Sequence, residues 1–286
     1  MWDRRTLKTN AKGVLRKYYW FVFLVCFVVL IVGAESNQPS NYYSRLSTDF
    51  DISNPPPLDF EDQAAIEEYL QHLQGRLVLW GIACGIALLV AAYKVFVGNL
   101  ILVGRCRCLM QARRDNPSLR DLFWAFKDGR YRKVVKTMFL RDLRLFLWSL
   151  LLIVPGIVKS YEYYYIPYLL AENPDIETKR VFELTRNMTY GEKGKIFVLG
   201  LSFFGWLLLA LIPYMIVSSS VTRSISAGAI SATVGGFVIT AVSAVCSSFL
   251  TPYIQATDAE LYAFVSARTL AQGMASAEEL PGFHFN

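Results

Sequence analysis

The sequence has little histidine and no cysteine arrangement suited to a metal. His72 and His284 are its two histidines, whereas a zinc site needs three or four close ligands from His, Cys or carboxylate residues. Cys106 and Cys108 have a one-residue gap, not the two-residue gap of common zinc pairs. A nucleophile with its base, a carboxylate pair with a histidine and a phosphate-binding glycine loop are also missing. We therefore predict no metal, no other cofactor and no enzyme.

Charged residues are almost missing from four long stretches of the chain. A helix of about 20 such residues crosses the roughly 30 Å hydrocarbon layer of a membrane. Lipid offers the backbone no hydrogen-bond partner, and stretches this long without alternation exclude a β-barrel. The pattern predicts an all-α, polytopic integral membrane protein with a bundle of spanning helices. The four stretches are residues 18–33, 77–104, 196–218 and 224–257.

Each sign of charge is scarce where the other is concentrated. Residues 1–17 carry six Lys/Arg and one Asp, and residues 105–144 carry twelve Lys/Arg and four acids. Residues 35–75 carry eight acids and only Arg45. Basic segments beside spans are retained in the cytoplasm, so the charge indicates topology and not nucleic-acid binding. We expect a multi-pass protein of the cell membrane with both termini cytoplasmic and with membrane lipids as partners.

The first 17 residues have the pattern of an amphipathic helix. Leu7, Ala11 and Leu15 recur at helical spacing, with arginine and lysine on the other faces. We expect this helix to lie on the inner leaflet and to lead into the first span. A basic leader, an apolar run and the small residues Gly33 and Ala34 are also typical of a signal peptide, so cleavage after Ala34 is the alternative.

The rest of the chain divides into spans and polar connections. We expect a single transmembrane domain over residues 18–270, followed by a flexible tail at residues 271–286. Three consecutive prolines and few apolar residues make the acidic loop an exterior segment without a core. The expected spans are residues 18–34, 77–104, 141–154, 157–172, 196–218 and 227–251, joined by the acidic exterior loop 35–76 and the basic cytoplasmic segments 105–140 and 173–195.

Residues 141–172 allow two topologies. One is a single kinked helix that crosses once and places the following polar segment outside. The other is a helical hairpin with Pro155 and Gly156 as its hinge, whose second arm returns the chain to the cytoplasm. Residues 173–195 are rich in Lys and Arg beside an apolar stretch, which favours the cytoplasm and therefore the hairpin. Each arm is short for a full span, so the pair can be partly re-entrant.

Several long motifs resemble one known family. They are LFWAFKDGRYRKVVKTMFLRDL, IVPGIVKSYEYYYIPYLLAENPDI, VFELTRNMTYGEKGK, LSFFGW and TPYIQATDAELYAF. In these motifs and their order, the chain resembles a bacterial membrane family known as domain of unknown function 975, which is distantly similar to the membrane domain of some glycerophosphodiester phosphodiesterases. The resemblance covers the basic amino-terminal helix and residues 97–266, whereas the loop of residues 35–75 and Val181 depart from it. It implies about six spans and supplies no activity or catalytic residue.

The charged pair Lys159 and Glu162 carries the main site hypothesis. The two residues face each other on one helix turn, and charges at membrane depth are candidates for function. The alternative, which we favour, is that they neutralise each other near the membrane surface while the tyrosines around them form an aromatic belt and donate hydrogen bonds between helices. The candidate residues of a polar cavity or partner-binding site are Lys159, Glu162, Tyr161, Tyr164, Tyr165, Glu172 and Asn173.

Two further pairs of polar residues are assigned to structure rather than function. Glu172 and Asn173 could hold a cation or meet a partner protein, but their place before Pro174 favours the termination and capping of helices. Asp258 and Glu260 are expected to pair with the basic cytoplasmic segment and to hold the last helix to it.

The sequence favours a non-enzymatic integral membrane protein of unknown activity. We expect it to bind lipid or a membrane-protein partner through a polar cavity at the hairpin. A transporter or export-accessory subunit is the first alternative, and it needs an aqueous path lined by charged groups. An intramembrane lipid-modifying enzyme is the second alternative.

Overall fold

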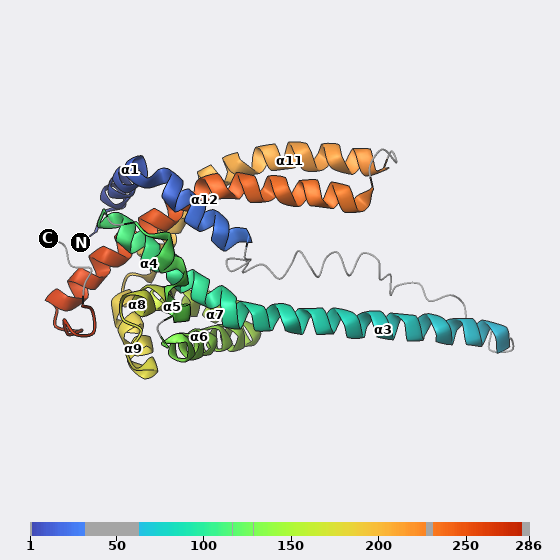
Figure 1. Ribbon diagram of the computed structural model, residues 1–286, viewed down its shortest axis with the longest axis horizontal. Coiled ribbons are helices and arrows are strands. Elements are labelled where there is room, and N and C mark those ends of the chain that lie inside the picture. The colour runs from blue at the N-terminus through green and yellow to red at the C-terminus, as the bar shows by residue number, and fades with distance from the viewer. Residues whose placement is uncertain (1, 32–62, 116, 128, 227–230, 282–286) are drawn as a thin grey trace.

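The computed structural model describes residues 2–31, 63–115, 117–127, 129–226 and 231–281 (Figure 1). This part of the chain is helical and contains no strand, as the all-α prediction requires. Most of the acidic loop lies outside the described residues. In chain order the elements are α1 (Arg4–Ile31), α3 (Gln63–Tyr93), the π-helix η1 (Lys94–Gly98), α4 (Asn99–Arg113), the 3₁₀-helix η2 (Leu119–Phe123), α5 (Trp124–Lys127), α6 (Tyr131–Leu151), α7 (Ile153–Glu162), α8 (Ile166–Glu172), α9 (Thr178–Thr189), α10 (Lys193–Leu201), α11 (Phe204–Ser226) and α12 (Ala232–Ala271).

The molecule has a packed part and projecting helices, which we call the body and the projections. The body comprises the first half of α1, α4, α5, α8, α9, α10 and the C-terminal half of α12. The projections are α3, the antiparallel pair of α11 with the first half of α12, and the tip between α6 and α7. In Figure 1, α3 and the α11–α12 pair extend from the body in the same direction. Exposed apolar side chains on the projections include Leu77, Trp80, Leu88, Leu151, Leu152, Ile157, Trp206, Ile216, Phe237 and Phe249.

Helix α1 has a kink at the boundary expected between its amphipathic and apolar halves. Tyr18 has φ −126° and ψ 28°, outside the helical region. The apolar face of the first half is buried, with Leu7, Ala11 and Leu15 in the core, and α1 makes its most extensive contact with α12. This face packs on protein and is not free to lie on the inner leaflet, so the expected lipid contact of that face is wrong. An amphipathic sequence pattern alone does not show whether lipid or protein covers the apolar face.

The chain reverses direction between α6 and α7. In a straight helix, Ser149 and Gly156 would be about 10.5 Å apart along the axis. A methyl group on Gly156 would instead lie 3.0 Å from the Ser149 Cα, and α6 packs along α7. The reversal occurs at Leu152, which is extended with φ −159° and ψ 141°.

The hinge is therefore three residues before the expected one at Pro155 and Gly156. In a continuous helix the Pro155 ring would clash with the carbonyl of Leu151, so α6 has to end before the proline. Pro155 then lies in the first turn of α7, where its missing N–H leaves no helix bond unmade. Gly156 allows the close packing of the two helices.

Residues 157–172 do not form the continuous span that we expected. Helix α7 ends at Glu162, a turn follows at residues 163–165, and the seven-residue α8 begins at Ile166. Pro167 lies at the start of α8, because its ring would clash with the Tyr163 carbonyl in an uninterrupted helix. All seven residues of α8 are buried inside the body.

Two described helical stretches, Arg4–Leu30 and Trp80–Arg113, are long and apolar enough to cross a membrane. A third arises if Lys193–Trp206 and Leu211–Ser224, which meet at a bend of 52°, form one span. These stretches are compatible with a membrane protein. The number of six spans stays a prediction.

The C-terminal segment is docked on α9 as far as residue 281, although we expected a flexible tail from residue 271. Leu280 is fully buried. Arg180 Nε lies 2.6 Å from Glu279 Oε1, and Asn173 donates to the main-chain carbonyl of Glu279 at 3.2 Å. We expected no docking because the segment has few apolar residues. The two polar contacts that hold it come from residues about 100 positions earlier in the chain.

Gly104 lets η2 pack directly on α4. A methyl group on Gly104 would lie 2.1 Å from the main-chain oxygen of Leu122 and 2.9 Å from its Cα. Both distances are far below van der Waals contact, so any side chain at this position would push η2 off α4.

Candidate functional site

The structure brings Lys159, Glu162 and Lys193 together at the base of the α6–α7 hairpin. Lys159 Nζ lies 2.8 Å from Glu162 Oε1, and Lys193 Nζ lies 2.7 Å from Glu162 Oε2. Glu162 is only 6% exposed, whereas both lysines are partly exposed. We call these three residues the lysine–glutamate cluster. One carboxylate between two ammonium groups leaves a formal net charge of +1.

Neighbouring elements fix the cluster in place. Thr185 Oγ1 on α9 donates to the main-chain carbonyl of Glu162 at 3.0 Å, which anchors the end of α7. Lys159 Nζ lies 5.5 Å from the centre of the Trp148 ring and 5.9 Å from that of the Tyr163 ring, so aromatic faces surround its ammonium group. The Lys159–Glu162 contact that the sequence indicated is therefore one side of a three-residue arrangement.

Lys193 is the partner that sequence analysis missed. It lies 31 residues after Glu162 and begins α10, in a glycine-rich segment that we had treated as a polar connection. The sequence signal that could have indicated Lys193 as a site residue was a basic side chain at the start of a helix. Its spatial partner could not be assigned, because α8 and α9 intervene in the chain.

The expected tyrosines do not all line a site with the cluster. Tyr161 is half-buried near the cluster, with its ring 6.2 Å from that of Phe197 on α10. Tyr165 is fully buried in the body, with its ring 5.8 Å from that of Tyr262 on α12. Tyr164 forms an edge-to-face pair with Tyr165. Tyr164 and Tyr165 thus contribute to the body core.

Glu172 and Asn173 are positioned for structural roles. The Tyr262 hydroxyl donates to Glu172 Oε2 at 2.5 Å inside the body. Asn173 binds the docked C-terminal segment through its side-chain amide and accepts from the Asp175 N–H at 2.9 Å through Oδ1. Asn173 lies at the C-terminal end of α8, as its expected role in helix termination requires, whereas the Glu172 contact joins α8 to α12.

The expected pairing of the last helix with the basic segment 105–140 is confirmed for Glu260. Glu260 Oε1 on α12 lies 2.8 Å from Arg113 Nε at the end of α4. Glu260 is buried, so this contact is protected from solvent. The ion pair connects the C-terminal half of α12 to α4.

Another buried carboxylate, Glu192, connects residues near the two ends of the chain. Its Oε2 accepts from Trp2 Nε1 at 2.6 Å, and its Oε1 accepts from Arg268 on α12. Arg268 also donates to the main-chain carbonyl of Met188 at 3.1 Å. No local pattern indicates this network, because its members are up to 190 positions apart.

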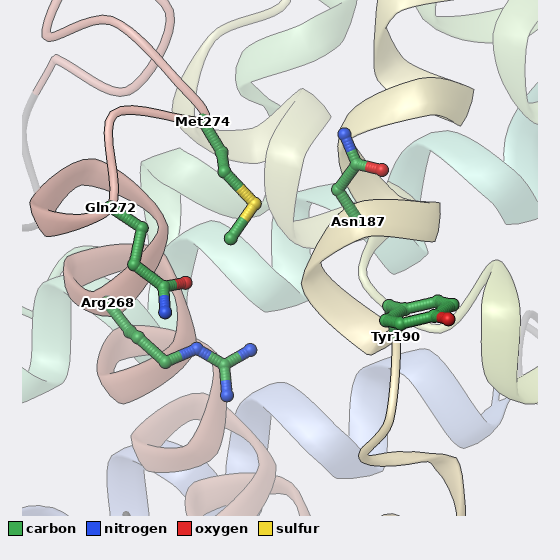
Figure 2. A pocket seen from close by; sticks show the side chains of 5 residues that line it. All are labelled: Asn187, Tyr190, Arg268, Gln272 and Met274. Carbon is green, nitrogen blue, oxygen red and sulfur yellow. The ribbon is translucent and has the colours of Figure 1, made fainter.

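A cavity of about 280 Å³ lies next to Arg268, at residues that sequence analysis did not single out. Figure 2 shows Asn187 and Tyr190 on one side and Arg268, Gln272 and Met274 on the other. Among the described residues, no group of three or more His, Cys, Asp or Glu side chains could hold a metal ion.

Residues 150–269 match the model of a family described as a protein of unknown function (DUF975). The matched region runs from the end of α6 into the last turn of α12, and it contains the whole lysine–glutamate cluster. It supports a domain of unknown function within the chain. Comparison with curated proteins and with solved structures finds no match.

Proposed function

We propose that this chain is a non-enzymatic, multi-pass protein of the cell membrane that binds anionic lipid headgroups at the lysine–glutamate cluster. The observation that carries the proposal is the net positive, partly exposed cluster immediately below an apolar hairpin tip. Phosphate oxygens would be attracted to the two ammonium groups, which share only one carboxylate.

The length of the hairpin supports this depth for the cluster. Seven residues separate Lys159 from the reversal at Leu152, which corresponds to about 10 Å of helix. Half of the roughly 30 Å hydrocarbon layer is about 15 Å. The tip therefore enters one leaflet without crossing it, and the cluster lies where the headgroups are. Trp148 and Tyr161 fit the interfacial preference of aromatic side chains.

The topology that we propose has four full crossings and one re-entrant hairpin. The crossings are α3, α11, the first half of α12 and the expected span 18–34, whose described part is the second half of α1. An even number of crossings agrees with the contacts of Glu192 with Trp2 and with Arg268, which keep both ends of the chain at the body. The basic body lies in the cytoplasm under the positive-inside rule.

Exposed cysteine probes test this topology. Asp115→Cys and Glu183→Cys place thiols on the body, and Ser226→Cys places one at the far end of α11. With a membrane-impermeant maleimide on intact cells, only the Ser226→Cys protein should react. Labelling of the Glu183→Cys protein from outside would overturn the proposed orientation.

Lipid retention tests the headgroup site. The protein, purified in detergent, is exposed to equal amounts of phosphatidylglycerol and phosphatidylcholine, and the bound lipids are counted by native mass spectrometry. Lys193→Gln should lower the preference for phosphatidylglycerol roughly fivefold, because one lysine near an anionic surface contributes about 1 kcal/mol. Glu162→Gln should raise the preference, since it removes the competing carboxylate.

Lys179→Gln is the matched control, because Lys179 is exposed on α9 and takes no part in the cluster. An unchanged lipid preference in Lys193→Gln and Glu162→Gln would contradict the headgroup site. Combining Lys159→Gln with Glu162→Gln separates structure from binding. If the double variant regains the thermal stability lost by each single variant and also keeps its lipid preference, the pair is purely structural.

A further inference from the structure

The cavity beside Arg268 lies between the C-terminal ends of two helices. Asn187 and Tyr190 come from the end of α9, and Arg268, Gln272 and Met274 come from the end of α12 (Figure 2). Its volume of about 280 Å³ is below the roughly 300–1,000 Å³ of pockets that hold a drug-sized molecule. The size suits one amino-acid side chain with its adjoining main chain.

Both walls of the cavity are fixed by left-handed glycines that end the helices. Gly191 follows α9 with φ 71°, and Gly273 follows α12 with φ 66°. The Gly273 N–H donates to the Leu270 carbonyl and the Met274 N–H to the Thr269 carbonyl, which is the Schellman arrangement. The end of this wall is therefore well determined by main-chain hydrogen bonds.

Arg180 holds the Met274 wall from behind. Its Nη2 donates to the Met274 carbonyl at 2.9 Å, while its Nε binds Glu279 at 2.6 Å. The docked C-terminal segment is thus part of the construction of the cavity. A preformed wall of this kind lowers the ordering cost of binding.

The electrostatics of the cavity disfavour charged ligands of either sign. Arg268, the charged residue of the lining, is already compensated by Glu192. The main-chain carbonyls at these helix ends already accept hydrogen bonds, among them those of the Thr269, Leu270 and Met188 carbonyls. The lining therefore carries no uncompensated charge that would attract an anion or a cation. A neutral ligand that bonds to the side-chain carboxamides suits such a lining.

The side chains of the lining match a peptide. Tyr190 is 81% exposed, more than any other large apolar side chain described, and Met274 lies across the cavity from it. Exposed tyrosine and adaptable methionine are typical anchors of protein interfaces. The carboxamides of Asn187 and Gln272 each offer a donor and an acceptor, as a peptide group does.

The position of the cavity indicates an aqueous partner and not lipid. The C-terminal end of α12 lies at the end of the molecule opposite to the tip of α3, at the side where both chain ends are found (Figure 1). The apolar projections leave the body in the other direction, so this end of the body faces away from their surroundings.

We infer that this cavity binds a short, uncharged peptide segment of a partner protein. One aliphatic or aromatic side chain inserts between Tyr190 and Met274, and the adjoining main chain forms hydrogen bonds with Asn187 and Gln272. The inference does not depend on the headgroup site, since the two sites use different residues and different probes.

Capped tripeptides test the inference on the full-length protein in detergent. Acetyl-Gly-Phe-Gly-amide, its Leu, Glu and Lys counterparts and a doubly N-methylated Phe peptide are titrated by saturation-transfer NMR. The Phe and Leu peptides should bind with a dissociation constant on the order of 1 mM. The Glu, Lys and N-methylated peptides should bind at least about tenfold more weakly, because they add charge or remove the N–H donors.

Two variants assign any binding to the cavity. Tyr190→Ser should weaken the Phe peptide at least about tenfold, and because Tyr190 is exposed the thermal stability should not change. Phe126→Ser, on an exposed aromatic residue of α5, should leave the affinity unchanged. Equal binding by the Tyr190→Ser protein, a preference for the Glu or Lys peptide, or no saturable signal from any peptide would each overturn the inference.

Discussion

Helices α8 and α3 are both strongly apolar, and the structure treats them in opposite ways. Every residue of α8 is buried, and Leu169 has no exposed surface. In α3, Leu88 is 71% exposed, and the side chains around it are exposed as well. The two helices differ in the surroundings that suit their side chains. Helix α8 is shielded from water inside the body, whereas in the topology that we propose α3 needs no protein cover, because lipid is as apolar as its own side chains.

Polar groups divide between the two regions in the same way. Buried ion pairs and hydrogen bonds connect the elements of the body, as Arg113–Glu260 and Tyr262–Glu172 illustrate. The described side chains of α3 between Leu77 and Tyr93 include no charged residue. The body is therefore held by specific contacts, and in the topology that we propose the projections depend on the membrane.

The largest expected effect compares the loss of one leucine in each region. Leu169→Ala should lower the free energy of unfolding by about 2–5 kcal/mol, because it opens a cavity in a packed core. Leu88→Ala should change it by less than about 0.5 kcal/mol, since its side chain contacts little of the protein. Denaturant unfolding of both variants in the same detergent, followed by tyrosine and tryptophan fluorescence, measures the two values. Equal losses would mean that α3 packs on the body in solution.

An added arginine should have the opposite pattern, with a large effect on α3 and a small effect on the body. Leu88→Arg should cost about 3 kcal/mol of membrane insertion, the usual cost of arginine near the centre of a span. Leu119→Arg, at an exposed position of η2, should insert as the unchanged protein does. Resistance to alkaline carbonate extraction from membranes reports insertion. Full resistance of the Leu88→Arg protein would show that α3 is not surrounded by lipid.

Two glycines test how closely the body is packed. Gly104→Ala should destabilise the protein by about 1–3 kcal/mol, because the added methyl group meets the backbone of Leu122. Gly13→Ala has open space around it in the helix α1 and should stabilise by about 0.5–1 kcal/mol. Thermal unfolding of the two variants compares them directly. A stabilising effect of Gly104→Ala would contradict the contact between α4 and η2.

The smallest expected effect concerns the docked C-terminal segment. The hydrogen bond from Arg180 holds the pKa of the Glu279 carboxyl below its ordinary value. A lowered pKa in the folded state means that the contact stabilises docking at neutral pH and is lost as the pH falls through that lowered pKa. The pair is partly exposed, so the effect should be about 0.2–1 kcal/mol.

Hydrogen exchange of residues 271–281 between about pH 7 and pH 3 measures this effect, after correction for the intrinsic exchange rate. Protection should decrease at acid pH in the unchanged protein. In Glu279→Gln, protection should be lower at neutral pH and should vary less with pH. The same pH dependence in both proteins would assign it to other groups.

Much of the architecture could be predicted from local patterns. The scarcity of charge in long stretches indicated helices that suit lipid, and the basic segment after residue 172 indicated a chain reversal. The proline indicated a reversal near Pro155. The exact position of the reversal depends on which main-chain carbonyl the proline ring would clash with, and for this reason the chain reverses at Leu152. Local sequence rules therefore predict the region of a turn more reliably than the exact residue at which the chain turns.

Contacts between distant parts of the chain could not be predicted in the same way. The pair Lys159–Glu162 was visible because its members are three residues apart, whereas Lys193 joins them only after α8 and α9 have folded. The apolar face of residues 4–17 was correctly identified, but whether lipid or α12 covers it depends on tertiary structure. A single sequence does not show which distant residues become partners in the folded protein.

The contact between α1 and α12 has a consequence for the synthesis of the protein. Helix α1 is synthesised long before α12, with which it makes its most extensive contact, and the Trp2 indole finds its acceptor Glu192 only after about 190 further residues have been made. Helix α4 is available early to pack on α1, but the part of the apolar face of α1 that α12 covers stays without its native neighbour until α12 has been made. Ribosome-bound chains truncated before residue 250 should therefore be inserted but still sensitive to protease at the N-terminus.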